Sequence, residues 1–176
     1  DAMATIKNFD RDGSFKIDGY KEIQISSKVK AEHYLKQFDV IVSHTDLTQN
    51  ADIIGNPALI LSTNGYNHLI ISMDITKVQS KTEYISNALL YSLLKSQTFK
   101  SHALGYVNGT TVLHLSKKAV PEYKLALPKD LSILESMNTI LSHIYKLISN
   151  NYKENKRLTQ IRDTLLPKLM NGEINV

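Results

Sequence analysis

The chain has 176 residues, which is enough for one ordinary domain and a sizeable appendage. Its hydrophobic fraction of 42% and charged fraction of 22% are those of a folded globular protein and exclude a disordered chain. A net charge of +4 is compatible with nucleic-acid binding, but many proteins that bind no nucleic acid carry as much charge.

Two features missing from the sequence indicate where in the cell the protein acts. No apolar run approaches the roughly 20 residues that span a bilayer, and no secretory signal pattern opens the sequence. The sequence also lacks cysteine, which excludes disulfides and thiolate chemistry, so we expect a cytoplasmic protein.

Between residues 15 and 127, short runs of β-forming residues alternate with polar turns. Pro57 can open one run, because the first position of a strand tolerates a missing N–H. One helix interrupts the series, since Ser80 and Glu83 form a capping box before apolar residues at helical spacing. The pattern predicts an α+β fold: a domain over residues 1–128 with a curved or barrel-like mixed sheet and few helices. The predicted strands are FKI (15–17), EIQIS (22–26), FDVIVS (38–43), ALILS (58–62), HLIIS (68–72), TVLHL (111–115) and YKLAL (123–127).

Residues 129–176 have the pattern of a long coiled-coil helix. Ser132 and Glu135 form a second capping box, and apolar residues then recur at alternating spacings of four and three. Such a 3.5-residue period over several heptads indicates a coiled coil, and polar seam positions can fix its register. The seam consists of Ile133, Met137, Ile140, Ile144, Leu147, Asn151, Glu154, Leu158, Ile161 and Leu165, with Leu134, Leu141 and Ile148 as a flanking row.

Pro167 should end this helix, because proline removes one backbone hydrogen bond and clashes with the preceding turn. A helix of about 35 residues is about 50 Å long and cannot bury its seam against itself. Either it pairs with another helix, or it packs back onto its own domain. So long a seam would overhang the preceding domain, which favours a partner helix.

Catalytic patterns are missing from the sequence. The six histidines lack zinc-ligand spacing, and there is no G-x-S-x-G elbow, P-loop or G-x-G-x-x-G. Neither a nuclease metal site nor a cofactor-binding βαβ unit for methylation is recognisable. We therefore expect no enzyme activity, no cofactor and no metal site in this chain.

Several segments resemble the specificity (S) subunits of type I restriction-modification systems. The stretch LTQIRDTLLPKLMNGEINV (158–176) is similar to the end of their conserved region, and residues 99–128 resemble the end of their target recognition domains. EYISNALLYSLLKSQTF (83–99) and FDVIVS (38–43) resemble a helix and a strand of the same domains. Two departures are clear: KDLSILES replaces the usual linker after Pro128, and the family's complete subunit has two recognition domains and two helices.

The resemblance implies a non-catalytic subunit that binds a bipartite duplex DNA target. Its implied partners are adenine methyltransferase (modification) subunits and, through them, a motor-nuclease (restriction) subunit. A chain with one domain and one helix can supply the missing half by two-fold dimerisation, with antiparallel helices. The expected dimer or partner interface is Met137, Ile140, Ile144, Leu147, Asn151, Leu158, Ile161 and Leu165.

Three polar loops offer side chains for DNA contacts if they share one face of the domain. Taken singly, each residue is more simply a solvated loop side chain. The candidates are Thr45, Gln49 and Asn50 in the first loop, Tyr66 and Asn67 in the second, and Asn108, Thr110, Thr111, His114, Lys117 and Lys118 in the third, with Lys100 and His102 before it.

Two other hypotheses remain open at this point. The chain could be a coiled-coil interaction module without specific DNA binding, or a small hydrolase whose catalytic residues are dispersed. Salt-dependent binding of a preferred duplex separates the first hypothesis from DNA recognition, and turnover by the purified chain would favour the second.

Overall fold

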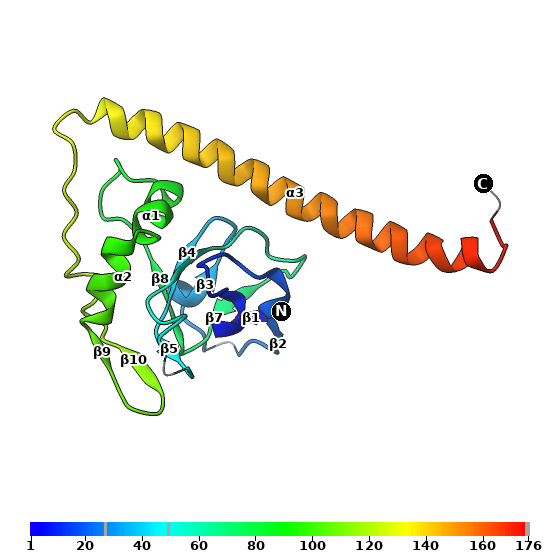
Figure 1. Ribbon diagram of the computed structural model, residues 1–176, viewed down its shortest axis with the longest axis horizontal. Coiled ribbons are helices and arrows are strands. Elements are labelled where there is room, and N and C mark those ends of the chain that lie inside the picture. The colour runs from blue at the N-terminus through cyan, green and yellow to red at the C-terminus, as the bar shows by residue number, and fades with distance from the viewer. Residues whose placement is uncertain (27, 49, 175–176) are drawn as a thin grey trace.

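The computed structural model describes residues 1–26, 28–48 and 50–174, and these form an α+β fold with a long C-terminal helix (Figure 1). We call residues 1–128 the globular part. It contains three small sheets and two short helices, α1 (Asn87–Leu94) and α2 (Gln97–Leu104). The α+β prediction is confirmed, but the strands belong to three sheets rather than one, and the described residues form no closed barrel.

The first sheet has the order β2-β1-β7-β3. Its strands are β1 (Ala2–Ala4), β2 (Lys21–Glu22), β3 (Tyr34–Leu35) and β7 (Leu69–Ile71). β1 runs parallel to β7, and the other pairs are antiparallel.

The other two sheets are antiparallel throughout. The second has the order β6-β4-β8, and the third has the order β5-β10-β9. The second contains β4 (Val40–Ser43), β6 (Pro57–Leu59) and β8 (Ile75–Val78), and the third contains β5 (Thr45–Asp46), β9 (Val107–Asn108) and β10 (Leu113–Leu115).

The core joins the second sheet and the two short helices to the first sheet and to Phe9 and Phe15. All four residues of β4 are buried, and Leu89 of α1 and Phe99 of α2 are completely buried. Serine hydroxyls cap both helices: that of Ser86 accepts from the N–H of Leu89, and that of Ser96 accepts from the N–H of Phe99. The predicted capping box at Ser80 is therefore wrong, because the hydroxyl of Ser80 instead closes a turn with Thr82.

Three predicted strands are absent or nearly so. In the first, residues 15–17, Phe15 makes only an isolated bridge to Phe9, and Ile17 begins a short 3-10 helix. Of residues 22–26 only Glu22 lies in a strand, and the YKLAL segment has no strand pairing. Pro57 does open β6, as predicted.

The C-terminal helix, α3, runs from Ser132 to Met170. The carboxylate of Asp130 accepts from the N–H of Ser132 at 3.0 Å, so the capping box predicted at Ser132 is wrong. The predicted end at Pro167 is wrong as well, since the helix continues for another three residues. The helix can continue because proline removes only one backbone hydrogen bond.

α3 ends in a Schellman motif. The N–H of Gly172 donates to the carbonyl of Leu169 at 3.2 Å, and the N–H of Glu173 donates to that of Lys168 at 2.9 Å. Gly172 has a φ of 71°, which glycine adopts without strain.

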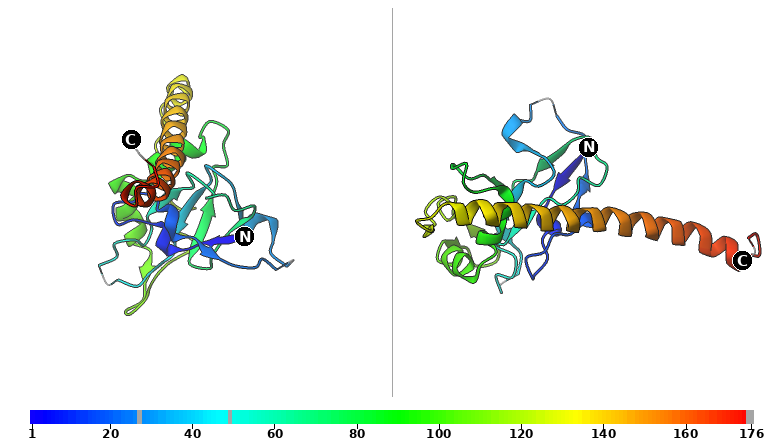
Figure 2. Two further views of the ribbon diagram at one scale, coloured as in Figure 1. Left: turned by 90° about the vertical axis from the view of Figure 1, so that its right-hand side faces the viewer. Right: turned by 90° about the horizontal axis from the view of Figure 1, so that it is seen from above.

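α3 contacts the globular part as far as Lys156, and its C-terminal end projects beyond it (Figures 1 and 2). Leu134 and Ser149 are buried in this contact, and the hydroxyl of Ser149 donates to the carbonyl of Leu61 at 2.6 Å. The Asn138 side chain accepts from the N–H of Ser86 at 3.0 Å and donates to the carbonyl of Tyr84 at 2.8 Å.

The predicted seam lies on a different face of α3 from this contact. Its members are exposed, including Ile140 at 58% and Leu158 at 52%. Packing back onto the chain therefore uses the flanking row that begins at Leu134, and the seam itself stays uncovered.

Candidate nucleic-acid interface

The third sheet brings two of the three polar loops together. In it, His114 of β10 lies directly between Thr45 of β5 and Asn108 of β9. The first loop therefore lies beside the β9–β10 hairpin, at the edge of the globular part remote from α3 (Figure 1). The exposed candidates on these two segments, and in the turn that follows β10, are Asn50, Asn108, Thr110, Thr111, His114, Lys117 and Lys118.

Glycine shapes the hairpin. Gly109 has a φ of 110°, and a Cβ atom there would lie 2.2 Å from the carbonyl oxygen of Val112. Only glycine fits this turn without strain. The turn leaves the side chains of Thr110 and Thr111 exposed at its tip.

The electrostatics of this region are mildly positive. Burial lowers the pKa of His44, and the nearby ammonium group of Lys117 lowers it further. The imidazole is therefore neutral at pH 7, and the exposed side chains of Lys117 and Lys118 supply the positive charge.

The loop with Tyr66 and Asn67 lies elsewhere. The Tyr66 hydroxyl donates to the carboxylate of Glu22 at 2.9 Å, and the nearby Asn64 side chain accepts from the ammonium group of Lys156 on α3. The structure therefore joins this loop to the helix and not to the hairpin.

Two other candidates, Thr45 and His102, make contacts within the globular part. Thr45 is buried and donates to the carboxylate of Asp74 at 3.0 Å. The Nε2 atom of His102 lies 2.8 Å from the carbonyl oxygen of Ala119, and its ring lies against Tyr123. Gln49 lies outside the described residues.

Lys100 has an internal role that the sequence did not reveal. Its ammonium group donates to the carbonyls of Ala51 at 2.9 Å and Ile54 at 2.7 Å, and to the side-chain oxygen of Asn56 at 2.8 Å. Burial lowers the pKa of Lys100, and the carboxylate of Asp46 partly opposes that shift.

Asp46 also binds the loop that follows β5 and contains residues 51–56, which Lys100 contacts. One carboxylate oxygen accepts from the N–H groups of Ile53 at 2.6 Å and Ile54 at 3.1 Å. The other accepts from the N–H of Thr48 at 2.8 Å and from its hydroxyl at 2.7 Å. We call Asp46 and Lys100 the loop clamp. The Asp-x-Thr pattern of residues 46–48 was a usable signal for an Asx turn, but nothing near Lys100 in the sequence indicates its partners.

The clamp predicts a loss of stability in acid. Burial by itself raises the pKa of Asp46, but the hydrogen bonds from Thr48, Ile53 and Ile54 outweigh burial and lower the pKa overall. Since the unfolded carboxyl titrates at about 3.9, the stabilisation is complete above that pH and is lost as the pH falls through the lower folded value. Urea unfolding between pH 6 and pH 2 should show a smaller pH dependence for Asp46→Asn than for the wild type. Equal pH dependence would contradict this role.

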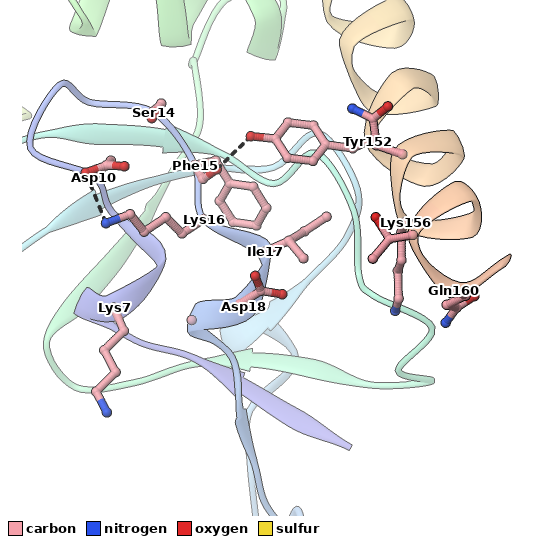
Figure 3. A pocket seen from close by; sticks show the side chains of 13 residues that line it. Lys7, Asp10, Ser14, Phe15, Lys16, Ile17, Asp18, Tyr152, Lys156 and Gln160 are labelled. Atoms are coloured by element: carbon pink, nitrogen blue, oxygen red, sulfur yellow. Dashed lines mark hydrogen bonds and ion pairs between the residues drawn. The ribbon is translucent and has the colours of Figure 1, made fainter. Parts of the chain in front are cut away.

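A groove of about 800 Å³ separates residues 7–19 from α3 (Figure 3). Its floor includes Phe15, whose carbonyl accepts from the Tyr152 hydroxyl at 3.2 Å, and an ion pair joins Lys16 to Asp10 at 3.0 Å.

Across the described residues, no three histidine or acidic side chains gather as a metal site would require. None of the described helices is long and apolar enough to cross a membrane.

Comparison with known proteins found no matching family model. The chain is 36% identical over 86 residues to the type I restriction enzyme HindI specificity subunit of Haemophilus influenzae, a match that covers 48% of this chain and 18% of that protein. It is 32% identical over 110 residues to the type I restriction enzyme MjaIX specificity subunit of Methanocaldococcus jannaschii, covering 62% of this chain and 23% of that protein. Each match spans less than a quarter of the relative, and the resemblance to type I specificity subunits is confirmed.

Proposed function

We propose that the chain recognises a DNA sequence for a type I restriction system. Residues 1–128 act as the target recognition domain, and residues 129–176 join it to its partners. The proposal is supported by the similarity to two specificity subunits and by the exposed polar and basic side chains in and beside the third sheet. In this role the chain itself is not catalytic and selects the DNA on which other subunits act.

The β9–β10 hairpin is the element that we expect to read bases. The major groove of B-DNA admits a two-stranded β-ribbon, and an Asn side chain can pair with the edge of adenine through two hydrogen bonds. Asn108 and the hydroxyls of Thr110 and Thr111 suit this task because they are exposed at or near the hairpin tip. Lys117 and Lys118 would contact phosphates, which fix the position of the domain without reading the sequence.

Two substitutions, one in the hairpin and one just after it, test these separate roles in reading bases and contacting phosphates. Once a target has been selected from a random duplex pool, Asn108→Ala should relax one base position and weaken binding to the target by about 1–3 kcal/mol. Lys117→Ala should weaken all sequences alike and reduce the salt dependence of binding by about one phosphate contact. Asn67→Ala, in the loop beside α3, is the matched control and should change neither property.

The outcome also discriminates between functions. If neither Asn108→Ala nor Lys117→Ala changes binding, or if the chain binds no duplex in a salt-dependent way, the DNA-recognition proposal fails. The chain would then act as a helical interaction module.

The exposed seam of α3 supports assembly with a second copy. In a two-fold dimer with antiparallel helices, two identical domains would read identical half-sites in opposite orientation, so the target should be an interrupted palindrome. Such a dimer would dock adenine methyltransferase subunits and, through them, the motor-nuclease subunit. Duplex selection with the dimer and its methyltransferase tests this symmetry, and two unrelated half-sites would contradict it.

A further inference from the structure

Two polar residues interrupt the exposed apolar seam of α3. Asn151 and Glu154 occupy consecutive seam positions, and both are exposed. Arg157 of the same helix lies 3.5 Å from the Glu154 carboxylate, so each helix carries a cation beside this acidic group. The two polar residues restrict how a second copy of α3 can cover the seam.

A parallel arrangement would bring identical seam positions together. Each Glu154 carboxylate would then face the carboxylate of its counterpart across the seam, and like charges at that distance repel. An antiparallel arrangement avoids this direct opposition and lets seam positions at one end meet those at the other.

Antiparallel registers that keep seam facing seam differ by whole heptads, and the residue opposite Leu158 identifies each one. If Leu158 faces Ile140 of the second copy, Asn151 faces Leu147 and Glu154 faces Ile144. If Leu158 faces Ile133, Asn151 faces Ile140 and Glu154 faces Met137. Both registers bury a carboxylate and an amide against apolar side chains, which is unfavourable without hydrogen-bond partners.

The register in which Leu158 faces Leu147 removes this conflict. Asn151 then faces Glu154, Ile144 faces Ile161, and Ile140 faces Leu165, so polar residues meet polar residues and apolar residues meet apolar ones. The Asn151 amide can donate to the Glu154 carboxylate, and two-fold symmetry repeats the pair on the other side of the axis. A shift by one more heptad would instead place Glu154 against Leu158.

We infer that two copies of α3 pair antiparallel in the register in which Asn151 faces Glu154 of the second copy. This inference rests on the dimer of the proposed function and specifies the surface that forms it. In this register the projecting half of each helix lies beside the half of the other helix that carries the globular part. The end turn at Gly172 comes opposite Ile133, so that exposed apolar residues at the two ends of the seam meet, among them Leu169, Met170, Leu131 and Ile133.

Cysteine cross-linking tests the register directly, because the sequence contains no cysteine. Three double variants combine Leu158→Cys with Leu147→Cys, Ile140→Cys or Ile133→Cys. All these positions are exposed and leave Asn151 and Glu154 intact. The three partner positions are one heptad apart, or about 10 Å along the helix. A disulfide requires Cα atoms about 4.4–6.8 Å apart, so each register cross-links one variant.

Oxidation should convert the Leu147→Cys/Leu158→Cys variant to a covalent dimer, while the other two variants and each single cysteine variant stay uncross-linked. A covalent dimer from Leu147→Cys alone would indicate parallel helices and overturn the inference. Cross-linking through Ile140→Cys or Ile133→Cys would overturn the register but leave the dimer of the proposed function. A monomeric mass by light scattering, together with no cross-link, would overturn both.

Discussion

Replacing Lys100 with methionine should lower the free energy of unfolding of the chain by about 3 kcal/mol. Methionine has a similar length but no donor, so the carbonyls of Ala51 and Ile54 and the side-chain oxygen of Asn56 would lose their shared partner. The carboxylate of Asp46 would also lose the nearby positive charge. Urea unfolding followed by circular dichroism measures this change, and Lys118→Met, at an exposed position, should stay within about 0.5 kcal/mol of the wild type.

The same variant separates two roles of Lys100. A lysine that contacts phosphate contributes to the salt dependence of DNA binding, whereas the loop clamp predicts no such contribution. Under conditions where Lys100→Met stays folded, the slope of binding affinity against salt concentration should equal that of the wild type. A reduced slope with unchanged stability would show that Lys100 contacts DNA and does not hold the loop.

Ile144→Asp should convert the proposed dimer into a monomer, weakening self-association by about 100-fold or more. Two-fold symmetry introduces the carboxylate twice, and each copy would be buried against apolar side chains in the middle of the seam. The globular part should keep its stability, because Ile144 is exposed in the single chain and lies on a different face from Leu134 and Ser149. Light scattering over a range of concentrations measures the dissociation, and unfolding by urea reports the stability.

Thr139→Asp is the matched control for this substitution. Thr139 is exposed on α3 one turn earlier and lies outside the seam, so the variant adds the same charge without entering the interface. It should remain a dimer. If both variants dimerise like the wild type, the seam of α3 does not form the interface.

The long helix and its seam could be predicted from the sequence because a helix repeats side-chain direction with a fixed period, so a strict heptad pattern is visible over many turns. The face of α3 that packs on the globular part was much less visible. It relies partly on polar residues such as Asn138 and Ser149, which look solvent-exposed in a sequence and acquire their role only through contacts with distant segments. The start of α1 was mispredicted for the same reason. Ser80 and Ser86 are both plausible helix caps, and Asn138 of α3 accepts from the N–H of Ser86 at the true start.

The candidate site was predictable to a similar extent. Asn108-Gly109-Thr110 is a turn pattern, and such turns expose their side chains at the surface. Lys100 and His102 also looked exposed, because both are polar and directly precede the third loop in the sequence. Their actual partners are the carbonyls of residues 51–56 and of Ala119, and only the tertiary fold brings those atoms within reach. A helical period or a turn can be read from residues that are neighbours in the sequence. Hydrogen-bond partners from distant segments cannot be read in this way.

The loop clamp has a consequence for how the proposed recognition surface can diversify. Lys100 and Asp46 hold the loop largely through backbone carbonyl and N–H groups, which every residue except proline supplies in the same form. The loop can therefore keep its shape while outward-facing residues such as Leu47 and Asn50 are exchanged. If the chain recognises DNA as proposed, natural variation or laboratory libraries at these two positions should yield new target preferences without compensating changes in the core.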